Sequence, residues 1–258
     1  MKFIEKKNFI EILNKLNLEN IEFLFIANDM GKFGLIKDLN KNSSFDFYYN
    51  EILKRNKSIT IVFPTASLNL VNNNVLFDII KTPSFKMGAL SEYLRKKEEC
   101  YRSLHPFWSL GAIGPKAKIL TSNSSKNPYD ENSVFAKIFE SSNSYFLSFG
   151  QHPRYMLSIV HHIEYLSKVD YRFVKKFHKK YIGYDRIYNE DYFELYVLNE
   201  EYRYKNRTKN KLIFDNFEKN NNLKKYFIND SEAYFFNLQN FLQISLELFK
   251  INPYCYWS

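Results

Sequence analysis

The segment Ile21-Glu22-Phe23-Leu24-Phe25-Ile26-Ala27 is a short apolar run with a single charge, a pattern that is typical of a buried strand. Residues 3–16 before it carry apolar side chains at helical spacing, and residues 28–35 after it form a turn with two glycines and Lys32. This order of helix, buried strand and turn predicts an α/β fold. Because open α/β sheets bind ligands beyond the carboxyl ends of their strands, the turn is a candidate site.

The rest of the chain continues this alternation. Apolar runs predict further strands at residues 58–64 and 145–150. Helical patterns cover residues 45–54, 89–96 and 134–139, and an aromatic-rich helix is predicted to close the chain at 233–249. Residues 204–225 are rich in Lys and Asn and indicate a long surface loop or a hairpin. No linker divides the 258 residues, so we expect one domain, with a core of about residues 1–200 and a less regular helical or hairpin region at 201–258.

Composition narrows the class of protein. The chain has 37 Lys and Arg against 28 Asp and Glu, and its net charge of +9 favours anionic partners such as nucleic acid, phosphorylated cofactors, nucleotide sugars or anionic lipid. No apolar run reaches the roughly 18 residues of a membrane helix, and residues 1–20 lack the apolar centre of a signal peptide. We therefore expect a cytoplasmic protein without membrane insertion. Cys100 and Cys255 have no metal-ligand spacing, which argues against a zinc ribbon or a disulfide framework.

The segment Ser158-Ile159-Val160-His161-His162-Ile163-Glu164-Tyr165 holds the best candidates for proton transfer. In a helix, residues three apart share a face, so Ser158, His161 and Glu164 point the same way, whereas His162 is turned about 100° from them. A carboxylate on the second ring nitrogen fixes the tautomer of a histidine and makes it more basic, as a general base requires. The ordinary alternative is a solvated surface pair of His161 and Glu164.

Two further segments carry polar groups. Residues 101–109 combine a guanidinium, hydroxyls, an imidazole beside a proline and an indole, a set that is typical of either a capped loop or a site. The helix with His161 follows the strand at 145–150, so we expect it and the turn at 28–34 to line one crevice. Residues 171–180 are basic with interleaved aromatics, which leaves nucleic-acid binding open beside an ordinary sheet edge.

Several enzyme classes lack their signatures. The chain has no G-x-S-x-G elbow for a serine hydrolase and neither a Walker loop nor a G-x-G-x-x-G loop for a kinase or dinucleotide enzyme. His-x-x-Glu is not a compact zinc signature, so a metal is not expected.

The ordered set of motifs resembles the aminoglycoside 3-N-acetyltransferase-like, antibiotic N-acetyltransferase family. The resemblance spans roughly residues 20–185 and rests, in order, on Thr82-Pro83-Ser84 with Met87-Gly88, Arg102-Ser103-x-His105-Pro106 with Ser109 and Gly114, the Ser133 loop, and Ser158-x-x-His161-x-x-Glu164. Two segments depart from the family pattern. Ala27-Asn28-Asp29 stands where the family often has His-Ser-Ser or His-Ser-Asp, and Asp130-Glu131-Asn132-Ser133 stands where it commonly has Gly-x-Gly-Ser.

The resemblance implies a mixed sheet, which we expect as a three-layer α/β/α sandwich with a small C-terminal appended lobe. It implies a CoA-dependent N-acyltransferase with acetyl-CoA or another acyl-CoA as donor and an amino group on a sugar as acceptor. Carried over, His161 is the general base, Glu164 its orienting carboxylate and Ser158 a supporting hydroxyl. The residues implied for binding CoA and the acceptor are Asn28, Asp29, Lys32, Phe33, Gly34, Asp78, Arg102, Ser103, His105, Tyr129 and Ser133. No metal and no nucleic acid are implied, and a homodimer is left open.

The net charge bears on the acceptor. A protein of charge +9 repels an aminoglycoside, which carries several ammonium groups, but attracts a nucleotide-linked or other anionic amino sugar. We therefore expect N-acylation of an amino sugar for surface polysaccharide biosynthesis. Aminoglycoside acetylation, which confers antibiotic resistance, is the alternative, and a non-catalytic glycan- or nucleic-acid-binding protein is a further one.

Overall fold

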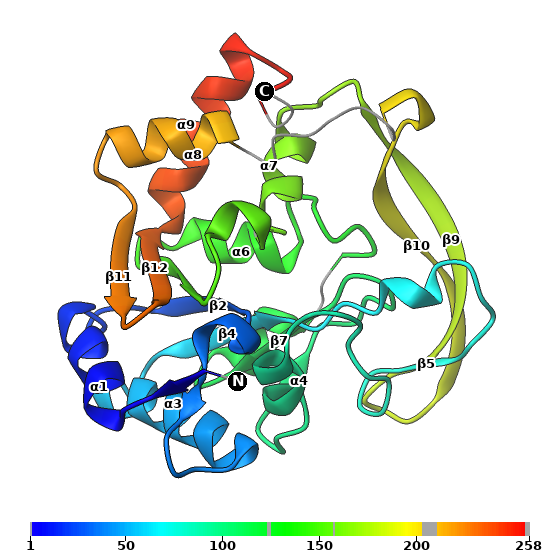
Figure 1. Cartoon of the computed structure of the whole chain (residues 1–258). Helices are drawn as coiled ribbons and strands as arrows, with labels where there is room; N and C mark the ends of the chain where they lie inside the picture. The colour runs from blue at the N-terminus through cyan, green and yellow to red at the C-terminus, as the bar shows by residue number, and fades with distance from the viewer. Residues whose placement is uncertain (1, 123–124, 157, 203–210, 256–258) are drawn as a thin grey trace.

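A seven-stranded mixed sheet forms the centre of the computed structural model, which describes residues 2–122, 125–156, 158–202 and 211–255 (Figure 1). The strand order is β11-β12-β8-β2-β4-β7-β6. β8, β2 and β4 are parallel to one another, whereas the strands on either side of this group pair antiparallel. The strands are β2 (Phe23–Asn28), β4 (Thr60–Pro64), β6 (Tyr101–Arg102), β7 (Leu110–Ile113), β8 (Ser144–Phe149), β11 (Lys224–Ile228) and β12 (Ser231–Asn237).

β2 explains why the sheet is covered on both faces. All of its residues are buried. Phe25 belongs to the apolar core on one face, and Leu24 and Ile26 belong to the core on the other. Because successive side chains of a strand point to opposite faces, a strand with apolar side chains on both faces needs cover on both sides. The predicted α/β fold with helices on both faces of a mixed sheet is confirmed.

The helices divide between the two faces. One core contains side chains of α1 (Lys6–Lys15), α2 (Met30–Phe33), α3 (Lys41–Arg55) and α4 (Ala89–Arg95). The other contains side chains of α5 (Ala117–Thr121), α6 (Val134–Glu140), α7 (Val160–Leu166), α8 (Lys211–Lys219) and α9 (Leu238–Ile251). The remaining short elements are β1 (Phe3–Ile4), β3 (Leu35–Ile36), η1 (Leu68–Leu70), η2 (Pro153–Tyr155) and η3 (Glu200–Tyr202). Within the described ranges, every helix is too short or too polar to cross a bilayer.

A long hairpin of β9 (Arg172–Ile182) and β10 (Tyr188–Leu198) curves along one side of the molecule, with β5 (Phe77–Asp78) beside β9 (Figure 1). Its inner face covers a small core that includes Phe107 and Phe193. On its outer face, basic side chains meet acidic ones across the strands: Lys176 lies 3.7 Å from Glu194 and Lys180 lies 3.5 Å from Glu190. The basic run at 171–180 is therefore a sheet strand whose outward charges are partly neutralised, which favours the sheet-edge alternative.

The C-terminal region differs from its prediction. Instead of an appended lobe, residues 211–251 add β11 and β12 to the main sheet and pack α8 and α9 on one of its faces. The segment Ser231–Asn237 pairs with β8, and the predicted helix begins only at Leu238, where the Asn237 side chain accepts a hydrogen bond from the N–H of Asn240 at 2.9 Å. Of the predicted loop at 204–225, residues 204–210 lie outside the described residues and most of the rest forms α8.

Candidate active site

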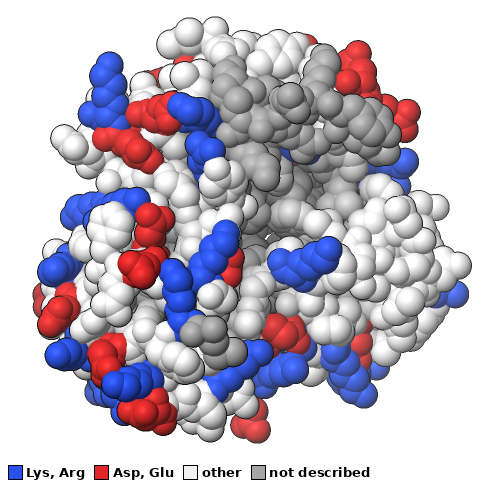
Figure 2. All heavy atoms as spheres, viewed as in Figure 1, with Lys and Arg blue, Asp and Glu red and all other residues white. Residues whose placement is uncertain are grey.

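A cavity of about 620 Å³ lies at the carboxyl ends of the three parallel strands. Its wall includes Asp29 just after β2, Pro64 at the end of β4 and Gln151 just after β8. Ser158 and His161 line the same cavity. The prediction that the turn after β2 and the segment with His161 line one crevice is therefore confirmed. Figure 2 shows several Lys and Arg side chains on the border of the hollow at the centre of the face in view.

His161 and Glu164 form a hydrogen-bonded pair on α7. His161 Nδ1 lies 2.6 Å from Glu164 Oε2, the His161 side chain is 20% exposed, and the Glu164 side chain is fully buried. The alternative of a solvated surface pair is wrong. An ionised Glu164 accepts the Nδ1 proton, and in that tautomer the imidazole carries its lone pair on Nε2. The pair therefore has the arrangement of a histidine base with its orienting carboxylate.

Glu164 has two more partners in the interior. The hydroxyl of Tyr171 donates to Oε1 at 2.9 Å, and Nε of Arg172 forms an ion pair with Oε2 at 2.9 Å. Burial raises the pKa of Glu164, but His161, through its hydrogen bond and through its charge when it is protonated, outweighs it together with the charge of Arg172 and the hydrogen bond from Tyr171, so the pKa lies below its ordinary value. Glu164 is therefore a carboxylate at neutral pH.

Aromatic rings surround the imidazole of His161. The rings of Trp108 and Tyr129 lie 5.9 Å and 5.8 Å from it, both edge to face. His162 points elsewhere: it is buried, its Nδ1 lies 2.7 Å from the carbonyl oxygen of Tyr129, and its ring stacks on Phe139. His162 is a packing residue, and the environment of His161 is apolar on the sides that these rings cover.

Ser158 lies in the turn before α7, so it does not share a helical face with His161 as predicted. The helix begins at Val160, and the carbonyl oxygen of Ser158 accepts a hydrogen bond from the N–H of His161 at 3.2 Å. Its side chain still belongs to the cavity wall next to His161.

Two predicted binding residues in the turn after β2, Asn28 and Asp29, line the cavity, but their side chains make hydrogen bonds that stabilise the fold. The amide of Asn28 donates to Ser91 Oγ at 3.0 Å and accepts from the N–H of Leu90 at 3.3 Å, which ties β2 to the start of α4. Asp29 caps α2 by accepting from the N–H of Lys32 at 3.2 Å. The ammonium group of Lys32 donates to Gln151 at 3.0 Å, at the rim of the cavity.

Four other predicted binding residues are structural. Phe33 is fully buried in the core, and Gly34 takes a φ of 122°, where an added Cβ would lie 3.0 Å from the carbonyl oxygen of Lys2. Ser103 Oγ accepts from the N–H of Leu110 at 3.0 Å and fixes the start of β7. Ser133 caps α6 by accepting from the N–H of Ala136 at 3.1 Å. None of the four lines the cavity.

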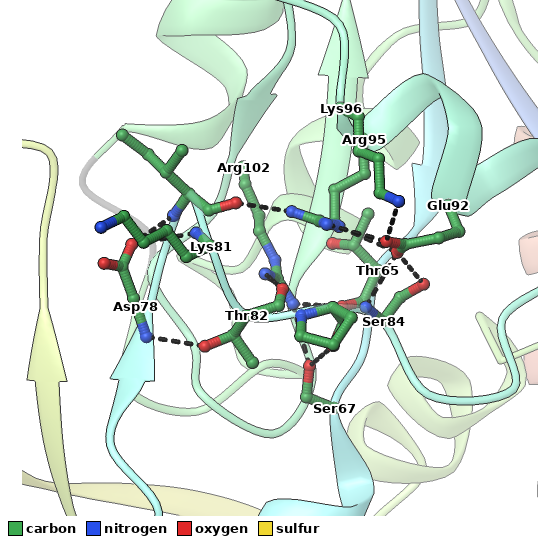
Figure 3. A network of polar contacts seen from close by, with 12 residues as sticks. Thr65, Ser67, Asp78, Lys81, Thr82, Ser84, Glu92, Arg95, Lys96 and Arg102 are labelled. Atoms are coloured by element: carbon green, nitrogen blue, oxygen red, sulfur yellow. Dashed lines mark hydrogen bonds and ion pairs between the residues drawn. The ribbon is translucent and has the colours of Figure 1, made fainter.

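Arg102 is also structural and forms the centre of a polar network (Figure 3). It is 2% exposed, and its guanidinium donates to the carbonyl oxygens of Thr65 at 2.5 Å and Thr82 at 2.6 Å and to the hydroxyls of Ser67 at 3.0 Å and Ser109 at 2.8 Å. Burial lowers its pKa to about 9, which leaves it protonated at pH 7. The arginine joins the loops after β4 and β5 to the end of β6, and the second of these loops carries residues 86–88 to the cavity.

Asp78 belongs to the edge of the same region. Its carboxylate pairs with Arg186 at 2.6 Å and accepts from the N–H groups of Ile80 and Lys81 at 2.9 Å and 3.0 Å. The hydrogen bond from Arg186 is the main reason why the pKa of Asp78 lies well below its ordinary value. Asp78 therefore attaches the β9–β10 hairpin to the loop after β5 and does not line the cavity.

His105 positions a wall residue of the cavity. It is 1% exposed, its Nε2 lies 3.0 Å from the carbonyl oxygen of Glu194, and its Nδ1 accepts from the N–H of Trp108 at 2.9 Å. Burial lowers the pKa of His105 to about 4, so the ring is neutral at pH 7. It supports Trp108, which lines the cavity, and is itself outside the wall.

Other cavity residues were not predicted. Lys86 and Arg154 supply cations, and neither has an ion pair with a carboxylate among the described residues. The apolar part of the wall comes from Met30, Met87, Trp108, Tyr155 and Met156. A long thioester with phosphates at one end fits this division, because the cations suit phosphate groups and the thioether and aromatic side chains suit a flexible chain. Of these residues, Trp108 belongs to the segment 101–109 that the sequence singles out, whereas single methionines have no recognisable sequence pattern.

Comparison with known proteins identifies the fold and the family. A family model described as aminoglycoside 3-N-acetyltransferase matches residues 58–250. No curated protein matches the chain. Among similar solved structures, aminoglycoside acetyltransferase AAC(3)-Xa has a TM-score of 0.80 at 14% identity, covering 96% of this chain and 93% of that one. AAC-IIIb, in a binary complex with CoASH, has a TM-score of 0.78 at 18% identity over 97% and 98% of the two chains. AAC-VIa, bound to sisomicin, has a TM-score of 0.78 at 14% identity, with the same coverage.

Proposed function

The chain belongs to the aminoglycoside 3-N-acetyltransferase family and is an N-acetyltransferase, and from this premise we propose that it transfers the acetyl group of acetyl-CoA to an amino group of a sugar with His161 as general base. The observation that carries the proposal is the contact between His161 Nδ1 and the buried Glu164 at 2.6 Å, on the wall of a cavity at the strand ends. The matched family model supports the same reaction class.

The cavity supports acetyl-CoA as the donor. CoASH is bound in the structure of AAC-IIIb, which shares the fold. Here Lys86 and Arg154 supply positive charge for the phosphate groups, and the apolar side chains of Met87 and Met156 suit the pantetheine chain. The acetyl thioester would then lie near His161.

His161 has the chemistry that the transfer requires. As the acceptor nitrogen bonds to the acyl carbon and the carbon–sulfur bond breaks, Nε2 of His161 takes the proton that the amine loses, and the proton is later released to the thiolate. Glu164 stabilises the imidazolium that forms in this step. Transfer within a complex of both substrates needs no acyl-enzyme, in keeping with Cys100 and Cys255, neither of which lines the cavity.

Charge in the cavity bears on the acceptor. Among the described residues, its wall has two cations, Lys86 and Arg154, and one carboxylate, Asp29, which lies 3.7 Å from the ammonium group of Lys32. A polycation would need several acidic groups, whereas a nucleotide-linked amino sugar brings its own negative charge. This supports an amino-sugar precursor of a surface glycan. The second candidate, an aminoglycoside, is favoured by the family and by the sisomicin complex of AAC-VIa.

An assay of thiol release from acetyl-CoA separates these acceptors. We expect turnover with a nucleotide-linked sugar that has a free amino group and little with sisomicin. Turnover with sisomicin alone would replace the glycan-precursor proposal by the antibiotic one. No turnover with either acceptor, together with a His161→Ala variant that behaves as the wild type, would refute the proposed reaction.

The two cations of the wall predict a defect in donor binding. Lys86→Gln and Arg154→Gln should each raise the KM for acetyl-CoA about tenfold and leave kcat within about twofold, because each loses one charge-assisted contact with phosphate. The KM should also depend less steeply on salt. Steady-state kinetics at varied acetyl-CoA measures both effects. Lys116→Gln, at the opposite end of the strands beside Glu22, is the matched control and should leave KM unchanged. An unchanged KM in both cavity variants would place the phosphates elsewhere.

A further inference from the structure

We propose that Arg172, the first residue of β9, is a positioning residue for the general base: it keeps Glu164 charged and aimed at His161, and its cation opposes protonation of the imidazole. This inference rests on the function proposed above. It assigns a role in the reaction to the β9–β10 hairpin, which otherwise serves as a cover for a small core.

The geometry places Arg172 and His161 on the same carboxylate oxygen. Glu164 Oε2 lies 2.9 Å from Arg172 Nε and 2.6 Å from His161 Nδ1. The Arg172 side chain is 8% exposed and the Glu164 side chain is fully buried, so water screens this ion pair very little. A buried carboxylate with a histidine alone would be only weakly compensated, because the neutral imidazole provides a hydrogen bond but no charge.

The guanidinium is itself held in place. Its NH1 group donates to the carbonyl oxygen of Tyr196 on β10 at 3.1 Å. The backbone of Arg172 pairs with that of Leu198 in the β9–β10 hairpin. Tyr171, the preceding residue, donates to the other oxygen of Glu164 at 2.9 Å. Both carboxylate oxygens therefore have partners from the root of the hairpin, and the plane of the carboxylate, which directs the hydrogen bond to His161, is fixed from outside α7.

Arg172 is the cation that acts on the pair. Among the described residues, the other titratable groups near the pair are the hydroxyls of Tyr129, Tyr165, Tyr171 and Tyr196, the thiol of Cys255 beside Tyr171, and the carboxylate of Asp170, which acts on Tyr196. Burial raises the pKa of Tyr171 above its ordinary value and that of Tyr196 to about 12, so both are neutral at pH 7. If His161 takes a proton, two positive charges face one carboxylate. Arg172 therefore lowers the tendency of the pair to hold a proton in the resting enzyme.

The pH dependence of kcat/KM for acetyl transfer tests this role. Arg172→Met removes the cation, so the His161–Glu164 pair binds a proton more tightly. The acid limb, which is the part of the profile where kcat/KM falls as the pH is lowered, should therefore move up by about one to two pH units. At pH values below the wild-type limb the activity should fall by up to about 10- to 100-fold, and the deficit should shrink as the pH rises. Arg172→Lys retains the charge and should keep the acid limb within about half a unit of the wild-type position. Arg172→Gln, which is uncharged but keeps a donor, should behave as the methionine variant and replaces it if that variant does not fold.

Arg186→Met is the matched control. Arg186 also joins the hairpin to the body of the protein through an ion pair, but its partner is Asp78, away from the cavity. It should leave the acid limb in place. The inference is overturned if folded Arg172→Met and Arg172→Gln proteins lose activity with an unmoved acid limb, since Arg172 would then only support the structure. It is also overturned if Arg186→Met moves the limb equally. A fully active His161→Ala enzyme would instead refute the proposed base, so the two failures are distinct.

Discussion

His161→Ala should lower kcat for acetyl transfer about 10³-fold, the range expected when a general base is removed. The variant retains the cavity and its cations, so the KM for acetyl-CoA should change little. The imidazole is bordered by the rings of Trp108 and Tyr129, and its loss leaves only a small, partly accessible gap. The fold should therefore tolerate the change. Rates measured at saturating concentrations of both substrates, with thermal unfolding of the same samples, provide the test.

His178→Ala serves as the control. His178 lies on the outer face of the hairpin, 3.3 Å from Glu190, and its side chain is 46% exposed. It should retain wild-type kcat, which would separate the effect at His161 from a general effect of losing a histidine. A His161→Ala enzyme with wild-type kcat would exclude the imidazole as the base and leave Glu164 with a purely structural role.

Arg102→Met should lower the free energy of unfolding by about 3–5 kcal/mol. The arginine is buried, and its removal takes a donor from the carbonyl oxygens of Thr65 and Thr82 and from the hydroxyl of Ser67; the Thr65 oxygen keeps a hydrogen bond from Ser109, and Ser67 keeps its bond to the carbonyl oxygen of Pro83. Each unpaired buried group costs about 1–3 kcal/mol. Denaturation with urea, followed by circular dichroism, measures the loss, and reduced binding of acetyl-CoA should accompany it because the loop that carries residues 86–88 is no longer fixed.

Two variants calibrate this effect. Arg102→Lys keeps the charge but cannot reach all of the acceptors, so its loss should fall between those of the wild type and the methionine variant. Lys37→Met removes the surface ion pair between Lys37 and Glu5, whose side chains are 59% and 48% exposed, and should change stability far less than Arg102→Met does, because water screens an exposed pair. If Arg102→Met were as stable as Lys37→Met and impaired only in catalysis, Arg102 would have to be assigned to ligand binding after all.

The sequence predicts the contact between His161 and Glu164 but does not distinguish binding residues from structural ones. The spacing of His161 and Glu164 predicts their contact because two residues three apart in a helix are neighbours regardless of the rest of the fold. The partners of Arg102 cannot be predicted in this way, because most of them are distant in the sequence. A guanidinium among hydroxyls and carbonyls has the same sequence pattern whether it binds a ligand or backbone oxygens, and only the tertiary structure shows which. Arg172 has the same limitation, because a single arginine at the start of a strand does not reveal a partner on a preceding helix.

The strand pattern has a related limit. β2 could be predicted because it is apolar at every position from Phe23 to Ala27, as is typical of a strand covered on both faces. In the segment 231–251, apolar and aromatic residues continue from β12 into α9, and the change from one element to the other depends on Asn237, which caps the helix. A strand followed at once by a helix therefore resembles a single amphipathic helix. Residues 231–237 form a strand because they pair with β8, and this contact with a distant segment cannot be predicted from the local sequence.

The placement of β12 in the main sheet has a consequence for synthesis of the protein. β8 pairs with β2 on one side and with β12, more than eighty residues later in the chain, on the other. On the ribosome, β8 therefore emerges with an apolar, unpaired edge that stays open until residue 237 has left the exit tunnel. The nascent chain should bind chaperones during this interval, and a truncation before β12 should aggregate even though it retains His161, Glu164 and the whole cavity wall.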